Sequence, residues 1–238
     1  MFEVCTAGVD LAKNVIQLHG VDADGTVVVK RQLRRNQFLS FFEGRPRCLI
    51  GMEACSGAHH WGRRLEEMGH EVRLMPPSYV KPYVKRGKTD AADAEAICEA
   101  VTRPSMRFVP VKSEAESAAL VLHRARDFLV GQATQTGNAI RAHLAEFGIV
   151  TAKGSKRVAE LADKLNALPE AARPPLQALF EQLAETQARI DQLTEEIKEV
   201  HQQNEVSRRL ASIPGVGVLT ATAIAATTPD VSNFGSAR

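Results

Sequence analysis

Residues 4–32 read VCTAGVDLAKNVIQLHGVDADGTVVVKRQ, and this stretch decides the fold class of the chain. It contains three short segments rich in β-branched and small residues, at positions 4–9, 15–21 and 26–32. The turn formers Asp22 and Gly25 separate the last two segments. The pattern therefore predicts a meander of three antiparallel strands.

A second group of elements follows this meander. Residues 47–52 (RCLIGM) form a continuous apolar run, which is typical of a strand buried on both faces of a sheet. The pattern then predicts a helix over 59–68 and a strand over 71–75. Three hairpin strands followed by strand, helix and strand predict an α/β fold with a mixed sheet. Ribonuclease H-like folds have this order, although the order is not unique to them.

Helices are expected over the rest of the chain, first at 90–101 and 113–147. Apolar residues between 176 and 200 then recur at steps of three and four. They are Leu176, Leu179, Leu183, Ile190, Leu193, Ile197 and Val200. This spacing predicts a coiled coil, either antiparallel or dimeric. The alternative is a single amphipathic helix on a globular core.

Composition limits the classes of protein. The 238 residues are 44% apolar, so a core can be buried, and the net charge is only +2. Any basic surface must therefore arise from local clustering. The four cysteines have no CxxC spacing, so neither zinc nor disulfides are expected. With no signal peptide and no bilayer-length apolar run, the expectation is a soluble, cytoplasmic protein without a membrane partner.

Two acidic residues stand at the ends of predicted strands. Asp10 ends the first strand, and Glu53 directly follows RCLIGM at the carboxyl end of a buried strand. Ligands and active sites of α/β sheets gather at that edge. A turn aspartate and a residue that leaves the sheet are the ordinary alternatives.

Asp90 and Asp93 are three residues apart at a predicted helix start, so both carboxylates can face one centre. A capping box would explain this pair equally well. Taken jointly, Asp10, Glu53, Asp90 and Asp93 predict a metal site for phosphodiester chemistry. Two divalent ions roughly 3.5–4 Å apart can activate the attacking oxygen and stabilise the leaving oxygen.

Basic residues and a glycine turn are the candidate nucleic-acid contacts. The basic residues Lys81, Lys85, Arg86 and Lys88 precede Asp90, and Arg103, Arg107 and Lys112 follow it. A basic approach suits a polyanionic substrate, although a solvated loop is the alternative. Gly215 and Gly217 lie in PGVG before a predicted helix, similar to the glycine turn of helix-hairpin-helix DNA binders. An ordinary tight turn would look the same.

Four motifs together resemble the insertion sequence 110-type, RuvC-like DEDD transposases. They are GVDLAKN (8–14), GMEACSGAHHW (51–61), KTDAADAEAI (88–97) and IPGVGVLTATAI (213–224). The resemblance implies a RuvC-like, ribonuclease H-like catalytic domain over 1–150, including a trailing long helix. It also implies a linker and coiled coil over 151–205 and an incomplete C-terminal transposase domain over 206–238.

The resemblance also implies chemistry and partners. Asp10, Glu53, Asp90 and Asp93 match the acids that bind Mg²⁺ (or Mn²⁺) in the family. DNA, an element-encoded guide RNA and a homo-oligomer formed through 176–200 are the expected partners, and the protein would associate with the bacterial nucleoid when acting on DNA. The family's serine nucleophile is expected beyond Arg238, which indicates a truncated chain, and Ser236 is not assigned that role.

Rival functions remain open at this stage. A RuvC-like nuclease acting on branched DNA would need only the four acids and water. A non-catalytic nucleic-acid-binding remnant would need none of them. An actin-like ATPase of the same fold ranks last, because the sequence lacks a second phosphate-binding glycine loop.

Overall fold

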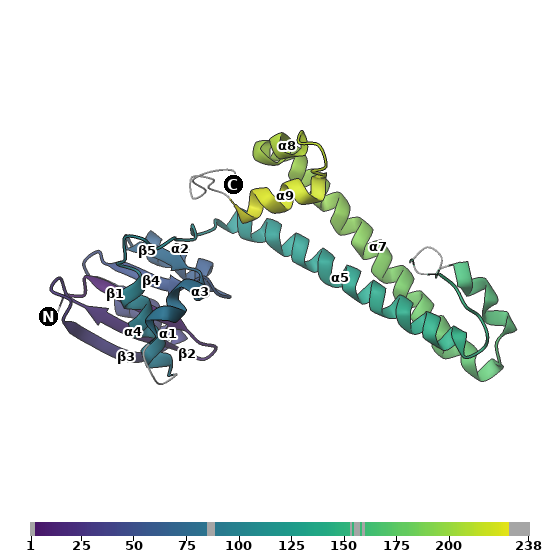
Figure 1. Cartoon of the computed structure of the whole chain (residues 1–238), viewed down its shortest axis with the longest axis horizontal. Coiled ribbons are helices and arrows are strands. Elements are labelled where there is room, and N and C mark those ends of the chain that lie inside the picture. Colours follow the sequence, from purple (N-terminus) through teal and green to yellow (C-terminus); the bar gives the residue numbers. More distant parts are fainter. Residues whose placement is uncertain (1–2, 85–88, 153, 155–157, 159, 229–238) are drawn as a thin grey trace. The chain divides into compact units, whose positions relative to one another are not determined.

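The computed structural model describes residues 3–84, 89–152, 154, 158 and 160–228. These form two compact units, within Met1–Ser113 and Glu114–Thr228. All strands of the described residues belong to the first unit, and the second is helical (Figure 1). In the part of the chain that the structure describes, no helix is long and apolar enough to cross a membrane.

The first unit is built on a five-stranded mixed sheet of order β3-β2-β1-β4-β5. Its strands are β1 (Thr6–Leu11), β2 (Val15–Val21), β3 (Val27–Arg34), β4 (Leu49–Glu53) and β5 (Glu71–Met75). The first three strands pair antiparallel, whereas β4 pairs parallel with both β1 and β5. The predicted mixed sheet is therefore confirmed, and its order is that of a ribonuclease H-like fold.

Helices α1 (Arg35–Phe42) and α2 (Ala58–Glu67) cover one face of this sheet. Their aromatic side chains form the centre of the core: the Phe38 ring lies 5.2 Å from that of Trp61 and 5.5 Å from that of Phe42, both edge-on. Such pairs add about 0.5–1.5 kcal/mol beyond the burial of their area. This packed layer buries one face of the sheet, and α4 covers the other face.

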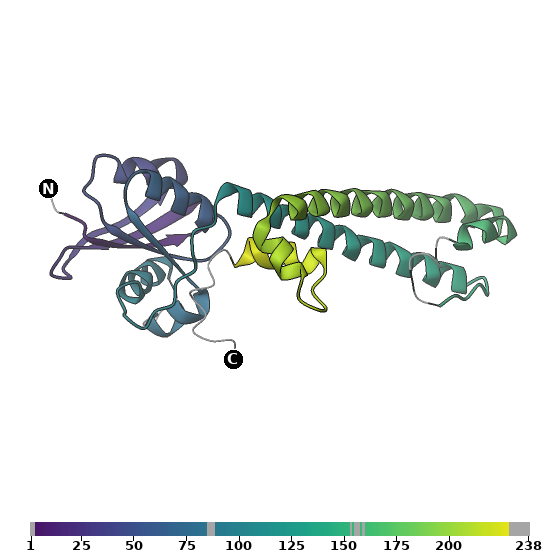
Figure 2. The ribbon, with the colours of Figure 1, turned by 90° about the horizontal axis from the view of Figure 1, so that it is seen from above.

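The opposite face carries α3 (Pro77–Val80), η1 (Lys81–Tyr83) and α4 (Asp90–Ala100), and Figure 2 shows α4 across the sheet from α1 and α2. Gly8 of β1 and Gly51 of β4 are register partners beneath α4. A Cβ atom at Gly8 would lie 2.1 Å from the carbonyl oxygen of Ala94, and one at Gly51 would lie 2.7 Å from Cβ of Val101. The two glycines therefore let α4 lie directly against the backbone of the central strands.

The second unit contains two long helices, α5 (Glu114–Ala145) and α7 (Arg173–Gln203), which lie side by side in Figures 1 and 2. The shorter elements are η2 (Glu160–Ala167), η3 (Glu170–Ala172), α8 (Glu205–Ala211) and α9 (Val218–Thr227). Prolines fill the first turn of α7, where a missing N–H removes no helical hydrogen bond. The chain runs out along α5 and returns along α7, so the two helices are antiparallel.

The apolar seam predicted over 176–200 is buried within the chain. Leu176, Phe180, Leu183 and Ile190 pack in one cluster with the buried side chains of α5. This part of the seam therefore packs against α5 of the same chain, and a coiled coil stays a prediction. The boundary between the compact units lies at residues 113 and 114, whereas the predicted functional domains 1–150, 151–205 and 206–238 stay a prediction.

Candidate metal centre

Asp10 and Glu53 lie at the carboxyl ends of the two central strands. Val9 of β1 pairs with Met52 of β4, so the next residue on each of these parallel strands is an acid. Both side chains are half-buried. The register thus brings together two carboxylates that are far apart in the sequence.

Asp90 and Asp93 occupy the first turn of α4. Thr89 caps this helix, and its side-chain oxygen accepts a hydrogen bond from the backbone N–H of Ala92 at 3.3 Å. The cap is therefore Thr89, so Asp90 is not the capping residue that the alternative interpretation required. The three-residue spacing places both acids on one side of the helix.

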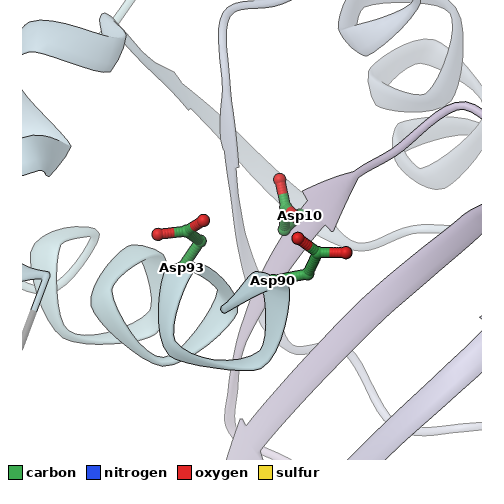
Figure 3. Close-up of side chains that lie close together, drawn as sticks. All are labelled: Asp10, Asp90 and Asp93. Carbon is green, nitrogen blue, oxygen red and sulfur yellow. The ribbon is translucent and has the colours of Figure 1, made fainter. Parts of the chain in front are cut away.

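The acids of β1 and α4 converge in space. Asp10, Asp90 and Asp93 each offer a carboxylate oxygen, and these three atoms all lie within 4.8 Å of one another. Figure 3 shows the three side chains on the same side of the first turn of α4, with Asp10 rising from the end of its strand. Glu53 is not part of this trio. The structure therefore brings together three of the four predicted site residues and leaves the fourth on the adjoining strand.

The acids influence one another electrostatically. Burial raises the pKa of Asp10 above its ordinary value, and the charges of Asp93 and Asp90 raise it further. A hydrogen bond from the backbone N–H of Leu11 partly opposes these effects. Burial also raises the pKa of Glu53, with added contributions from Asp10 and Asp93. Glu53 therefore lies within electrostatic reach of the trio.

This donor set fits a hard divalent cation. Carboxylate oxygens are the protein ligands that Mg²⁺ and Mn²⁺ favour, whereas zinc sites favour histidine and cysteine. A cation among these acids would relieve both their mutual repulsion and the cost of their burial. Asp10, Asp90 and Asp93 could hold it directly, and Glu53 lies beside them.

The predicted nucleic-acid contacts have different outcomes. Lys81 is exposed in η1, whereas Lys85, Arg86 and Lys88 lie outside the described residues. Lys112, also expected to offer a basic surface, is buried, with an exposed fraction of 8%. Its amino group lies 3.4 Å from the ring nitrogen Nε2 of His59.

Gly215 and Gly217 lie in the exposed turn between α8 and α9. Gly215 has a φ of +87°, a conformation that favours glycine, and the N–H of Val216 donates to the carbonyl of Ile213 at 3.0 Å. Gly217 is the N-terminal cap of α9. The turn thus has the expected position before a helix, and its contact with DNA stays a prediction.

Sequence reasoning missed two polar side chains next to Asp10. Gln17 of β2 is the register partner of Asp10, and Gln32 of β3 is the partner of Gln17. The three residues form one row across the sheet. The alternation of β2 and β3 contained the signal, but the pairing register was needed to use it.

Fold and site together define a class of protein. A mixed sheet in this order, with acids at the ends of its central strands and in the first turn of the crossing helix, defines a ribonuclease H-like domain with an acidic centre suited to a divalent metal. A family model described as "Transposase", that of the insertion sequence 110-type DEDD transposases, matches residues 7–149.

Curated relatives cover nearly the whole chain. A putative transposase, y4pF/y4sB, of Sinorhizobium fredii is 45% identical over 239 residues, which is 99% of this chain and 62% of the relative. A probable family 20 transposase of Pseudomonas aeruginosa is 44% identical over 97% of this chain and 70% of its own length. The transposase for insertion sequence element IS1328 of Yersinia enterocolitica is 36% identical over 100% of this chain and 72% of its own length.

The chain belongs to the insertion sequence 110-type DEDD transposase family. It spans 62% of the length of the Sinorhizobium relative and 70% of that of the Pseudomonas relative.

Proposed function

We propose that this chain provides the metal-dependent catalytic unit of an insertion-sequence transposase, a recombinase that binds DNA and cleaves and transfers its strands. The observation that carries the proposal is the convergence of Asp10, Asp90 and Asp93 within 4.8 Å in a ribonuclease H-like domain. Family membership supports DNA as the substrate.

In this proposal Asp10, Glu53, Asp90 and Asp93 are the catalytic acids. Asp10, Asp90 and Asp93 bind Mg²⁺ or Mn²⁺, and Glu53 adds a fourth carboxylate next to them. The ion supplies Lewis-acid stabilisation of charge on the scissile phosphate. Asp10 and Glu53 are fixed by the central strands, and the α4 acids by the close packing of that helix on Gly8 and Gly51. The protein thus orients the ligands before DNA binds.

Contacts with the DNA backbone come from basic and glycine residues in this proposal. The residues are Lys81, Lys85, Arg86, Lys88, Gly215 and Gly217. Lysine and arginine neutralise phosphates, and the glycine turn before α9 presents backbone N–H groups to them. An element-encoded guide RNA, a homo-oligomer and a serine nucleophile complete the proposal, on the support of the family resemblance.

DNA cleavage tests the function, measured with the chain extended through the segment beyond Arg238 in which the family resemblance implies the serine nucleophile. We expect strand breaks in a supercoiled plasmid in Mg²⁺ or Mn²⁺ and none in EDTA. Asp10→Asn should reduce the rate at least about a hundredfold, because losing a partner outside the ligand shell already costs up to that much. Glu43→Gln, an exposed acid at the end of α1, is the matched control and should retain the full rate.

The products of cleavage separate the rival functions. A covalent protein–DNA adduct that survives denaturation would indicate a side-chain nucleophile, as in a transposase. Free 5′-phosphate ends with no adduct, above all on a four-way junction, would instead identify a RuvC-like nuclease that uses water. If the chain binds DNA but never cleaves it, and Asp10→Asn binds equally well, the catalytic proposal is wrong.

A further inference from the structure

A groove lies beside the acidic centre, between α4 and the outer strands of the sheet. Its volume is about 370 Å³. Gln17, His19, Lys30 and Gln32 of β2 and β3 line one side, and Thr89, Ala92 and Glu95 of the α4 segment line the other. Arg31 also borders the groove, but it is the register partner of Leu18, a core residue on the opposite face of the sheet. The groove follows the same face of the sheet that carries Asp10, because register partners share a face.

The groove begins directly next to the metal ligands. Asp10, Gln17 and Gln32 are successive register partners across β1, β2 and β3. Directly opposite residues of antiparallel strands have Cβ atoms about 4.5–5.5 Å apart. The Gln17 side chain therefore starts within one strand spacing of Asp10, and Gln32 extends the row to the edge strand. A molecule bound at the acidic centre would meet Gln17 first and then Gln32.

The polar groups of the groove suit a neutral ligand surface. Within the described part of the chain, neither the Gln17 nor the Gln32 amide has a side-chain hydrogen-bond partner, and each could both donate and accept. The cation Lys30 is paired with Glu95 at 3.6 Å. Sugar and base edges need donors and acceptors of this kind, whereas a phosphate would favour an unpaired cation.

The dimensions of the groove select the form of the ligand. Pockets of about 300–1,000 Å³ hold small molecules, so this groove is at the lower end of that range. A base pair within a DNA duplex could not enter it, whereas one nucleotide separated from its partner could. Enzymes that act on nucleotides commonly take them out of the stack in this way.

We propose that this groove binds one unpaired nucleotide of the DNA strand whose phosphate lies at the acidic centre. Gln17 and Gln32 hydrogen-bond the base edge of that nucleotide and so fix the register of the strand. The inference rests on the proposed function, since it requires DNA at the Asp10 centre. Gln17 and Gln32 are positioning residues and take no part in the chemistry.

Binding of a single strand tests the inference. The probe is a fluorescein-labelled oligothymidine, with the full chain in Ca²⁺ so that binding is measured under conditions chosen to limit cleavage. Gln17→Ala and Gln32→Ala should each raise the Kd about threefold to tenfold, as expected for the loss of one net hydrogen bond. Gln192→Ala removes an exposed glutamine of α7 and is the matched control, with an unchanged Kd.

An abasic scan separates contact from structure. One abasic position in the oligonucleotide should weaken binding by the wild-type chain but not further weaken binding by the Gln17→Ala/Gln32→Ala variant. Such non-additivity arises only when the amides and the missing base interact. Additive effects at every position would overturn the inference, as would an unchanged Kd in both single variants.

The outcome is distinguishable from failure of the proposed function. If Asp10→Asn abolishes metal-dependent cleavage while both glutamine variants bind and cleave like the wild type, only the groove inference is wrong. If the glutamine variants lose affinity for Mn²⁺ in the absence of DNA, the row supports the metal site itself and the nucleotide inference is overturned.

Discussion

At the scale of single residues, both partial burial and the neighbouring negative charges raise the pKa values of the acidic centre. Burial is the largest cause of the raised pKa of both Asp10 and Glu53. Between the ordinary pKa and the raised one, the folded chain binds more protons than the unfolded chain. The free energy of unfolding of the metal-free protein therefore falls as the pH rises through that window. The whole loss of stability is present above the raised pKa values, where both carboxylates are ionised in the folded chain.

Asp10→Asn should make the metal-free protein more stable than the wild type, and less stable than the wild type once metal is added. In EDTA at neutral pH the variant should melt at a higher temperature than the wild type. It carries no buried charge at position 10, and it removes the electrostatic repulsion between Asp10 and Glu53. The difference should shrink as the pH falls toward the ordinary aspartate pKa of 3.8. Differential scanning calorimetry in EDTA across this pH range measures both effects.

In Mg²⁺ or Mn²⁺ the wild type should melt at a higher temperature than Asp10→Asn. A ligand present at a hundred times its Kd stabilises the folded wild type by about 2.7 kcal/mol. That raises the melting temperature of the first unit by roughly 10 °C. A variant that keeps this shift, or that melts lower than the wild type in EDTA at neutral pH, would contradict the assignment of Asp10 as a ligand.

At the scale of elements, the centre depends on how closely α4 approaches the sheet. Gly8 and Gly51 have no side chain at the point where α4 crosses β1 and β4. Gly8 lies against the carbonyl of Ala94, the residue directly after Asp93, and against Cys98 one turn further along α4. This contact therefore fixes where Asp90 and Asp93 lie. A helix lifted by one methyl group would carry both acids away from Asp10.

Gly8→Ala should therefore disrupt both folding and metal binding. The added Cβ would lie 2.1 Å from the Ala94 carbonyl oxygen, a backbone atom that cannot move alone. We expect a loss of about 1–3 kcal/mol or more in stability, as for other overpacked cores, and weaker affinity for Mn²⁺. Chemical denaturation and titration calorimetry measure the two quantities.

Gly131→Ala in α5 is the matched control. A Cβ there meets nothing within 4 Å, so the same change should stabilise the helix by about 0.5–1 kcal/mol. If Gly8→Ala were as well tolerated as Gly131→Ala, close packing of α4 would not position the acids.

At the scale of the whole molecule, the helical unit offers an exposed apolar surface through which copies could associate. Its α7 seam is buried against α5 of the same chain, so an oligomer that leaves this pair intact would use other surfaces. Val121 and Phe128, seven residues apart on α5, remain 63% and 66% exposed. Residues at this spacing lie on one side of a helix, so a partner helix could bury both side chains together.

We therefore expect self-association of the full chain to depend on α5. Val121→Ser with Phe128→Ser should weaken it at least about tenfold, since burial of one such side chain contributes about 1.5–3 kcal/mol. Val150→Ser, at a residue 81% exposed outside the helices, should leave it unchanged. Analytical ultracentrifugation measures the effect, and an unaltered oligomer in the double variant would exclude this surface.

Much of the fold follows from local patterns. The alternation and turn residues of 4–32 predict the meander, and the apolar run before Glu53 predicts the buried central strand. The steps of three and four over 176–200 predict a long amphipathic helix. These features depend on neighbours in the chain, whose geometry is the same wherever the segment lies.

The amino-acid sequence alone predicts the main strands and the long helices, the acids that end the central strands and begin α4, and the family resemblance. The short elements α3, η1, η2 and η3 were not predicted. Three further features come from the packed structure: Asp10, Asp90 and Asp93 meet while Glu53 adjoins them, α5 covers the α7 seam, and Gln17 and Gln32 continue the Asp10 row. Strand register and the closeness of α4 depend on contacts between distant segments. Local propensity does not encode those contacts, because they arise only when the whole core packs.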